Sequence, residues 1–198
     1  MTESAPAAAR RLRVLSANIQ AGSSTRRYSD YVTRSWSHAL PAGNKRGSLD
    51  AIAQMAAEHD IVGLQEIKVH DDEFPLSDVE AMGYHVYYFG QKGHYGVAIL
   101  SKAPAQHMQY GFPTDEPDAQ RRMLIGRFNM ADGTPLTVLN GYFPQGENRD
   151  HPIKFPAKTK FYADLQQYLT QHHTPDECLA VIGDINISPV DLDIGIGE

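Results

Sequence analysis

The stretch Ile61-Val-Gly-Leu-Gln-Glu66 decides the fold of this 198-residue chain. Its first five residues are an uncharged, mostly apolar run, which predicts a short strand that is buried on both faces, as in an α/β protein. A helix is predicted just before it, because Ser48 can cap a segment reaching His59 whose apolar residues recur at helical spacing. A helix followed by a buried strand indicates an α/β (α+β) domain with a mixed sheet.

Further strands and helices are predicted on both sides of this stretch. The predicted strands are Leu12 to Ile19, Tyr84 to Phe89, Tyr95 to Ser101, Met123 to Phe128, Pro135 to Phe143 and Leu179 to Gly183. Helices are predicted near Pro75 to Met82 and from Pro156, as the first helical residue, to about His172. Residues 1–10 are expected to be a disordered leader, and residues 21–48 a long loop or insertion within a single domain spanning 11–198.

The net charge of −6 is distributed unevenly along the chain. Residues 176–198 hold six acidic side chains and no Lys or Arg, so residues 1–175 are balanced at eighteen of each sign. Basic residues gather in Arg10 to Arg46 and in Arg149 to Lys160, which are either solvated surface or contacts for an anionic polymer. This charge pattern leaves nucleic acid open as a partner.

The sequence favours a cytoplasmic protein without a membrane partner. No segment approaches the roughly 20 consecutive apolar residues of a membrane-spanning helix. The opening residues lack the apolar run of a secretory signal. Cys178 is the single cysteine, which excludes an internal disulfide and fits a reducing compartment.

Polar side chains stand at the carboxyl ends of three predicted strands. Asn18 ends the first strand, Glu66 follows the second, and Asp184 and Asn186 follow the last. Ligands of α/β proteins bind beyond the carboxyl ends of strands, so we expect these side chains to lie together. Each also has a plainer explanation, since Glu66 could be a solvated strand end and Asn186 part of a turn.

The chemistry of these side chains suits a hard cation. Carboxylate and amide oxygens, water and substrate phosphate are the ligands that Mg²⁺ prefers, which fits Glu66 and the amide oxygen of Asn18. Asp184 and Asn186 would point to the same face of an extended segment, where one could orient a water and the other a phosphoryl oxygen. Motifs of phosphate-loop, zinc-protease and serine-hydrolase enzymes are missing from the sequence. A phosphodiester is therefore the predicted substrate.

Several motifs together closely resemble those of the exonuclease III family. They are Gly63-Leu-Gln-Glu66, Lys68-Val-His-Asp-Asp72, Gly90-Gln-Lys-Gly-His-Tyr-Gly-Val97, Gln120-Arg-Arg122, Asn140-Gly-Tyr-Phe-Pro-Gln-Gly-Glu147, Arg149 to Lys158, Gly183-Asp-Ile-Asn-Ile-Ser-Pro189 and Asp191 to Glu198. The resemblance implies the four-layer αββα sandwich of the endonuclease/exonuclease/phosphatase superfamily, incomplete in this chain. It also implies 3′-to-5′ exonuclease and abasic-site endonuclease action on duplex DNA with Mg²⁺ or Mn²⁺, and calls for no obligate protein partner.

The resemblance implies a role for each matching residue. Asn18 and Glu66 correspond to the metal-site pair, and Tyr142 to the tyrosine that hydrogen-bonds the scissile phosphate. Asp184 and Asn186 correspond to the pair that orients the attacking water and supports the leaving oxygen. Three further positions, which the resemblance implies are DNA contacts, are Arg122, Gln145 and Lys154.

The sequence departs from the exonuclease III pattern in two places. Residues 21–48 look more like another branch of the superfamily, and the further aspartate and the Ser-Asp-His histidine of the family do not occur within residues 1–198. We therefore expect an incomplete active site and, for these residues alone, at best a poor nuclease. Two alternatives stay open: a phosphatase or phosphodiesterase of the superfamily acting on a non-DNA phosphoester, and a non-catalytic fragment.

Overall fold

Two four-stranded sheets form the centre of the computed structural model, which describes residues 12–19, 52–53 and 56–188. Sheet A consists, in order, of β1 (Val14–Asn18), β2 (Ile61–Gln65), β4 (Val97–Ser101) and β3 (His85–Phe89). Sheet B consists, in order, of β5 (His107–Tyr110), β6 (Met123–Asn129), β7 (Pro135–Tyr142) and β8 (Cys178–Asp184). A short 3-10 helix, η1 (Asp71–Glu73), precedes the α-helix α2 (Leu76–Glu80), and α3 (Lys154–His172) connects β7 to β8.

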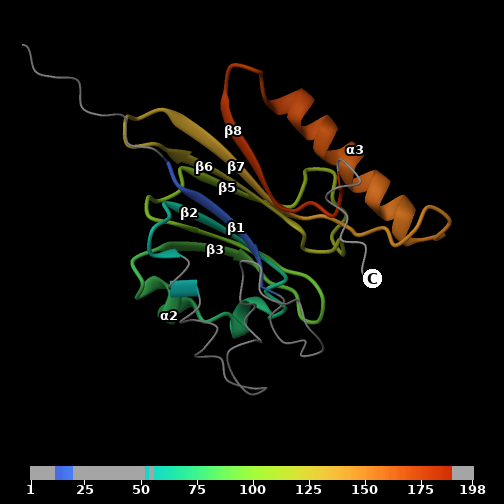
Figure 1. Cartoon of the computed structure of the whole chain (residues 1–198), viewed down its shortest axis with the longest axis horizontal. Coiled ribbons are helices and arrows are strands. Elements are labelled where there is room, and N and C mark those ends of the chain that lie inside the picture. The colour runs from blue at the N-terminus through green and yellow to red at the C-terminus, as the bar shows by residue number, and fades with distance from the viewer. Residues whose placement is uncertain (1–11, 20–51, 54–55, 189–198) are drawn as a thin grey trace, which may run out of the picture.

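The sheets stack face to face, with α2 outside sheet A and α3 outside sheet B (Figure 1). Val79 of α2 packs into the apolar cluster on the outer face of sheet A. Leu165 and Tyr168 of α3 pack into the corresponding cluster on the outer face of sheet B. A third cluster, including Ile99 and Val138, fills the space between the sheets. This order of layers confirms the predicted αββα sandwich.

Most predicted elements lie within a few residues of the observed ones, with two differences. β5 was not predicted, and α3 begins at Lys154, so Pro156 stands inside its first turn and is not the first helical residue. The predicted leader 1–10, the insertion 21–48 and most of the predicted helix from Ser48 to His59 lie outside the described residues. Within the described ranges, none of the helices combines the length and apolar character that crossing a bilayer requires.

Strand direction brings the site residues to one end of the sandwich. In sheet A β1 pairs with β2 in parallel, and in sheet B β7 pairs with β8 in parallel. The carboxyl ends of each pair therefore lie at the same edge of their sheet. β1 and β8 also contact each other across the two sheets. The chain segments that follow these strands can consequently meet, as the sequence predicted.

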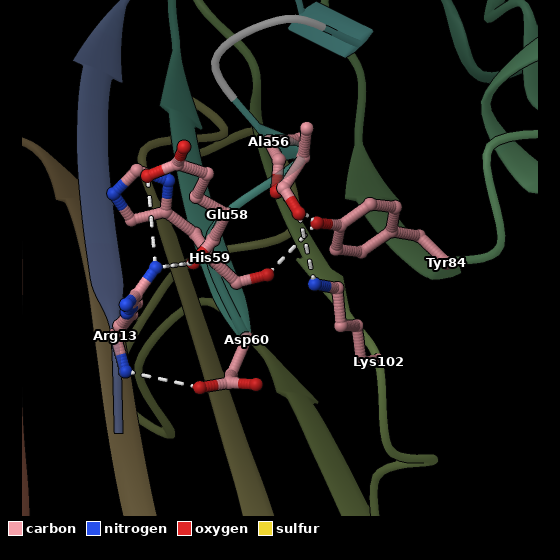
Figure 2. A network of polar contacts seen from close by, with 8 residues as sticks. Arg13, Ala56, Glu58, His59, Asp60, Tyr84 and Lys102 are labelled. Carbon is pink, nitrogen blue, oxygen red and sulfur yellow. Dashed lines mark hydrogen bonds and ion pairs between the residues drawn. The ribbon is translucent and has the colours of Figure 1, made fainter. Parts of the chain in front are cut away.

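Polar contacts fix the opposite end of sheet A, where β1 and β2 begin (Figure 2). The backbone N–H of Arg13 donates to the carboxylate of Asp60 at 3.1 Å. The hydroxyl of Tyr84 donates to the carbonyl of His59 at 2.8 Å. The bond between Arg13 and Asp60 holds the residues just before β1 and β2 against each other, and the bond from Tyr84 anchors the segment that leads into β2.

Gly63 in the middle of β2 has no room for a side chain. A Cβ atom there would lie 2.6 Å from Oδ1 of Asn140 and 2.6 Å from Cδ1 of Ile182, both in sheet B. Gly63→Ala is therefore expected to lower the free energy of unfolding by about 1–3 kcal/mol through overpacking, as measured by denaturant titration. Ile182→Val removes the Cδ1 atom, so the alanine should cost less in the double variant. An equal cost in both backgrounds would contradict the steric explanation.

Candidate active site

Three of the predicted site residues meet at the carboxyl ends of β1, β2 and β8. The side-chain nitrogen Nδ2 of Asn18 donates to Oε1 of Glu66 at 2.7 Å and to Oδ2 of Asp184 at 2.8 Å. Two carboxylates from different sheets thus converge on one amide. The sequence predicted that Asn18 offers its amide oxygen to this site, whereas the structure places its nitrogen between the carboxylates.

Glu66 is held by positive charge as well as by the amide. Nζ of Lys68 lies 2.8 Å from Oε2 of Glu66, and both side chains are about a tenth exposed. Burial raises the pKa of Glu66, but the ion pair with Lys68 and the hydrogen bonds from Asn18 and Tyr142 outweigh it and lower the pKa below its ordinary value. Glu66 is consequently a carboxylate at neutral pH, as a cation ligand must be.

Tyr142, at the end of β7, completes the link between the sheets. Its hydroxyl hydrogen-bonds Glu66, and the pKa of Tyr142 is raised, first by burial and then by the negative charge of Glu66. The guanidinium of Arg122 lies over the Tyr142 ring at 4.7 Å and over the Tyr95 ring at 4.5 Å. Arg122 also donates to the backbone carbonyl of Tyr142 at 3.0 Å. Tyr142 is thereby a neutral, immobilised hydrogen-bond donor facing the carboxylates.

Asn186 does not take the position that its spacing predicted. β8 ends at Asp184, and Asn186 has a φ of 55°, so the two residues do not share an extended segment. Asparagine tolerates this left-handed conformation better than most residues, which explains the turn here. The side-chain nitrogen of Asn186 donates to the carbonyl of Phe143 at 2.9 Å, which ties the end of β8 to the end of β7.

The predicted DNA contacts lie around this end of the sandwich, in different environments. Gln145 is exposed, and its carbonyl accepts a hydrogen bond from Lys158 of α3 at 3.1 Å. The same Lys158 ammonium donates to the carbonyl of Asn186 at 2.7 Å, which joins the two loops beside the site. Lys154 is exposed and forms an ion pair with Glu147. Arg122 is mostly committed to the two tyrosine rings.

Three polar side chains that were not predicted from the sequence support the site. Lys68 pairs with Glu66, and Gln65 of β2 hydrogen-bonds Asn140 of β7 at 2.6 Å across the sheets. Gln65 and Asn140 are 1% and 0% exposed. Gln65 and Asn140 could have been noticed in the sequence as amides within otherwise apolar strands. A buried amide seldom lacks a specific hydrogen-bond partner, so each of them indicated such a partner.

The donor set fits a magnesium-like ion better than a transition metal. Within the part of the chain that the structure describes, no group of three or more His, Cys, Asp or Glu side chains could hold a metal. The site instead offers two carboxylates and an amide. Mg²⁺ is commonly bound by one or two carboxylates, with water and substrate phosphate completing its shell. The residues present therefore suit a hard divalent cation that is shared with a phosphate.

The chain matches known proteins over most of its length. The model of the endonuclease/exonuclease/phosphatase family matches residues 15–196. Exodeoxyribonuclease III of Haemophilus influenzae is 57% identical over 139 residues, which are 70% of this chain and 52% of that protein. This chain thus spans about half the length of that relative.

Solved structures show the same similarity. An AP endonuclease from Archaeoglobus fulgidus matches 93% of this chain and 61% of its own, with a TM-score of 0.70 and 25% identity. A 3′ phosphatase from Neisseria, solved with a product DNA hairpin bound, matches 73% of this chain and 55% of its own, with a TM-score of 0.63 and 33% identity. The similarity to the AP endonuclease therefore extends over nearly all of this chain.

Proposed function

This chain belongs to the endonuclease/exonuclease/phosphatase family, and from that membership we propose that it acts as a metal-dependent DNA-repair nuclease. The proposed reaction is hydrolysis of phosphodiester bonds in duplex DNA, at abasic sites or at 3′ ends. The observation that supports it is the convergence of Glu66 and Asp184 on the amide of Asn18, in a chain so similar to an exodeoxyribonuclease III. We place this activity in the cytoplasm.

Mg²⁺ or Mn²⁺ is the proposed cofactor. Glu66 would hold the ion together with the amide oxygen of Asn18, for which the Asn18 side chain must turn, because its nitrogen faces the two carboxylates here. A bound ion of this kind neutralises the charge that develops on a phosphate under attack. Lys68 keeps Glu66 ionised by its ion pair of 2.8 Å. The carboxylate is therefore available to a cation without first losing a proton.

The remaining site residues are proposed to act on the phosphate and the water. Tyr142 keeps its proton because its pKa is raised by burial and by Glu66, so it can donate to a phosphate oxygen. Asp184 is proposed to orient the attacking water and accept its proton. Asn186 is proposed to support the leaving oxygen, for which its side-chain nitrogen must exchange its bond to the Phe143 carbonyl.

Arg122, Gln145 and Lys154 are proposed to contact the DNA strand. They lie beside the end of β7 and at the start of α3, and all three carry donors suited to phosphate oxygens. Contacts of this kind position a duplex without reading its sequence.

Lys154→Ala is expected to weaken DNA binding about equally for all sequences. The variant loses one phosphate contact, so the slope of log affinity against log salt should fall by about one. Fluorescence anisotropy over a salt series measures both quantities. Lys160→Ala is the matched control, because Lys160 lies on the same helix and is also ion-paired, with Asp164. Sequence-selective loss, or an equal loss in the control, would contradict the proposed contact.

The decisive experiment measures cleavage of a duplex that carries one abasic site. Because the chain spans about half of its curated relative, residues 1–198 should be assayed beside the same residues joined to the remaining half of that exodeoxyribonuclease III. Cleavage should require Mg²⁺ or Mn²⁺ and stop on chelation. If the joined protein with Mg²⁺ leaves the duplex intact, the proposal fails.

A phosphatase is the second candidate. The supporting observation is the similarity to a 3′ phosphatase bound to DNA, at 33% identity over 73% of this chain. A duplex with a 3′ phosphate, a duplex with an abasic site and a small aryl phosphate separate the possibilities. Release of phosphate from the first or the third substrate, without cleavage of the second, would favour the phosphatase.

A further inference from the structure

A pair of buried amides joins the two sheets directly behind the candidate site. Gln65 of β2 and Asn140 of β7 are 1% and 0% exposed. Nε2 of Gln65 donates to Oδ1 of Asn140 at 2.6 Å, a bond between sheets A and B. We name these two residues the inter-sheet amide pair. The rest of the space between the sheets is filled mainly by apolar side chains.

The amide pair is anchored to the backbone of sheet A. Nδ2 of Asn140 donates to the carbonyls of Leu64 and Ala98 at 3.0 and 2.9 Å. Nε2 of Gln65 also lies 3.2 Å from the carbonyl of Gly63, within its own strand. Because the two bonds donated by Asn140 cross from sheet B to sheet A, a displacement of the sheets leaves its buried amide unpaired. Such a group costs about 1–3 kcal/mol.

The site beyond the amide pair depends on the same placement. Glu66 follows Gln65 directly, and Tyr142 stands two residues after Asn140, on the same face of β7. The hydrogen bond between Tyr142 and Glu66 crosses from one sheet to the other, as does the amide pair itself. Apolar contacts alone do not fix how far one sheet is shifted along the other, because hydrophobic burial has no direction. Hydrogen bonds do, because they weaken steeply with misalignment.

We infer that Gln65 and Asn140 are positioning residues of the site, which fix the offset between the sheets and so hold Glu66 opposite Tyr142. Gly63 leaves the space that the Asn140 side chain occupies, because a Cβ atom at Gly63 would lie 2.6 Å from Oδ1 of Asn140. Naming the site as the metal centre of a nuclease rests on the proposed function. The placement of the side chains of Glu66 and Tyr142 is independent of the proposed function and can be measured separately.

The test compares Gln65→Met with Val138→Ala in the 198-residue chain labelled with ¹⁵N-asparagine. Methionine keeps the length of the side chain and removes its donors. Val138 is fully buried in the same space between the sheets, so its truncation is the control for general loss of packing. The observable is the side-chain NH₂ signal of Asn18, which is shifted by its bonds to Glu66 and Asp184. We expect Gln65→Met to move this signal and Val138→Ala to leave it.

The double variant Gln65→Met/Asn140→Leu separates positioning from stability and also decides the case if Gln65→Met does not fold. Replacing both partners of a buried hydrogen bond by apolar groups is often nearly neutral, so stability should largely return. The Asn18 signal should nevertheless stay displaced. A wild-type signal in either Gln65 variant, or an equal displacement in Val138→Ala, would overturn the inference.

Titration with Mn²⁺ adds a readout that bears on the proposed function. Loss of an outer-shell partner typically weakens metal binding by about 10- to 100-fold, and we expect that range for Gln65→Met. If the unchanged protein binds no Mn²⁺, the proposed metal site fails while the Asn18 signal still decides the positioning role. Unchanged Mn²⁺ affinity in Gln65→Met would count against that role.

Discussion

Asp184→Asn is expected to lower the rate of abasic-site cleavage by about 10² to 10⁴, the usual contribution of a general base. Asp184 ends β8 and accepts a hydrogen bond from Asn18 at 2.8 Å. An asparagine can still accept that bond through its amide oxygen, so the site should keep its shape. It cannot accept a proton from water. The change therefore removes chemistry with little structural loss.

Single-turnover cleavage with saturating Mg²⁺ measures this effect in whichever protein proves active, the chain itself or its joined form. Asp176→Asn is the matched control, because it makes the same chemical change at an exposed position before the start of β8. The control should cleave at the parental rate. A loss of less than about tenfold in Asp184→Asn would remove this residue from the role of general base.

Glu66→Gln should have the second large effect, on metal binding and stability together. It removes the charged ligand proposed for the ion. Loss of an outer-shell partner alone weakens metal binding by about 10- to 100-fold, so the affinity for Mn²⁺ should fall by at least that much. It also leaves Lys68, whose side chain is 8% exposed, without the carboxylate of Glu66. Breaking a buried pair on one side destabilises by about 3–5 kcal/mol. Calorimetric Mn²⁺ titration and denaturant unfolding measure the two effects.

The double variant Glu66→Gln/Lys68→Met separates the effect on metal binding from the effect on stability. Removing both charges should restore much of the stability, because an apolar replacement of a buried ion pair is often neutral. Metal affinity should stay low, since the ligand is still missing. Recovery of affinity together with stability would show that Glu66 supports the fold and does not bind the ion.

The pH dependence of stability gives an independent check on Glu66. The folded protein lowers its pKa below the ordinary value of 4.5. The carboxylate therefore stabilises the fold at pH values above 4.5, and this contribution is lost as the pH falls through the lower folded value. Glu66→Gln should lack this part of the acid-induced loss. Identical acid limbs in the two proteins would argue against the ion pair.

The sequence predicted those strands whose burial leaves a continuous signal. Every residue of β2 and of β4 is buried, so both strands are continuous, mostly apolar runs, which indicate buried strands. β5 was missed because its four residues, His107-Met-Gln-Tyr110, are half exposed and form an edge strand, which among the described strands pairs with β6 alone. Edge strands bury little, and a short one leaves no period to detect.

The sequence predicted which side chains lie together at the candidate site better than it predicted the contacts between them. Asn18, Glu66 and Asp184 were found because strand ends of one direction share an edge. The pairing of Glu66 with Lys68 depends on left-handed conformations at both residues, with φ of 55° and 53°, which spacing does not reveal. The bond between Gln65 and Asn140 joins residues 75 positions apart in different sheets, and no local pattern encodes such a distance.

The hydrogen bond between Asn18 and Asp184 joins residues that stand 166 positions apart. Closing a chain segment this long costs entropy, which other contacts of the folded chain must offset. A newly synthesised or partly unfolded molecule therefore has no assembled site, even when single strands have formed. For a protein whose proposed chemistry breaks DNA, strand cleavage would then require that both ends of this long segment are folded together.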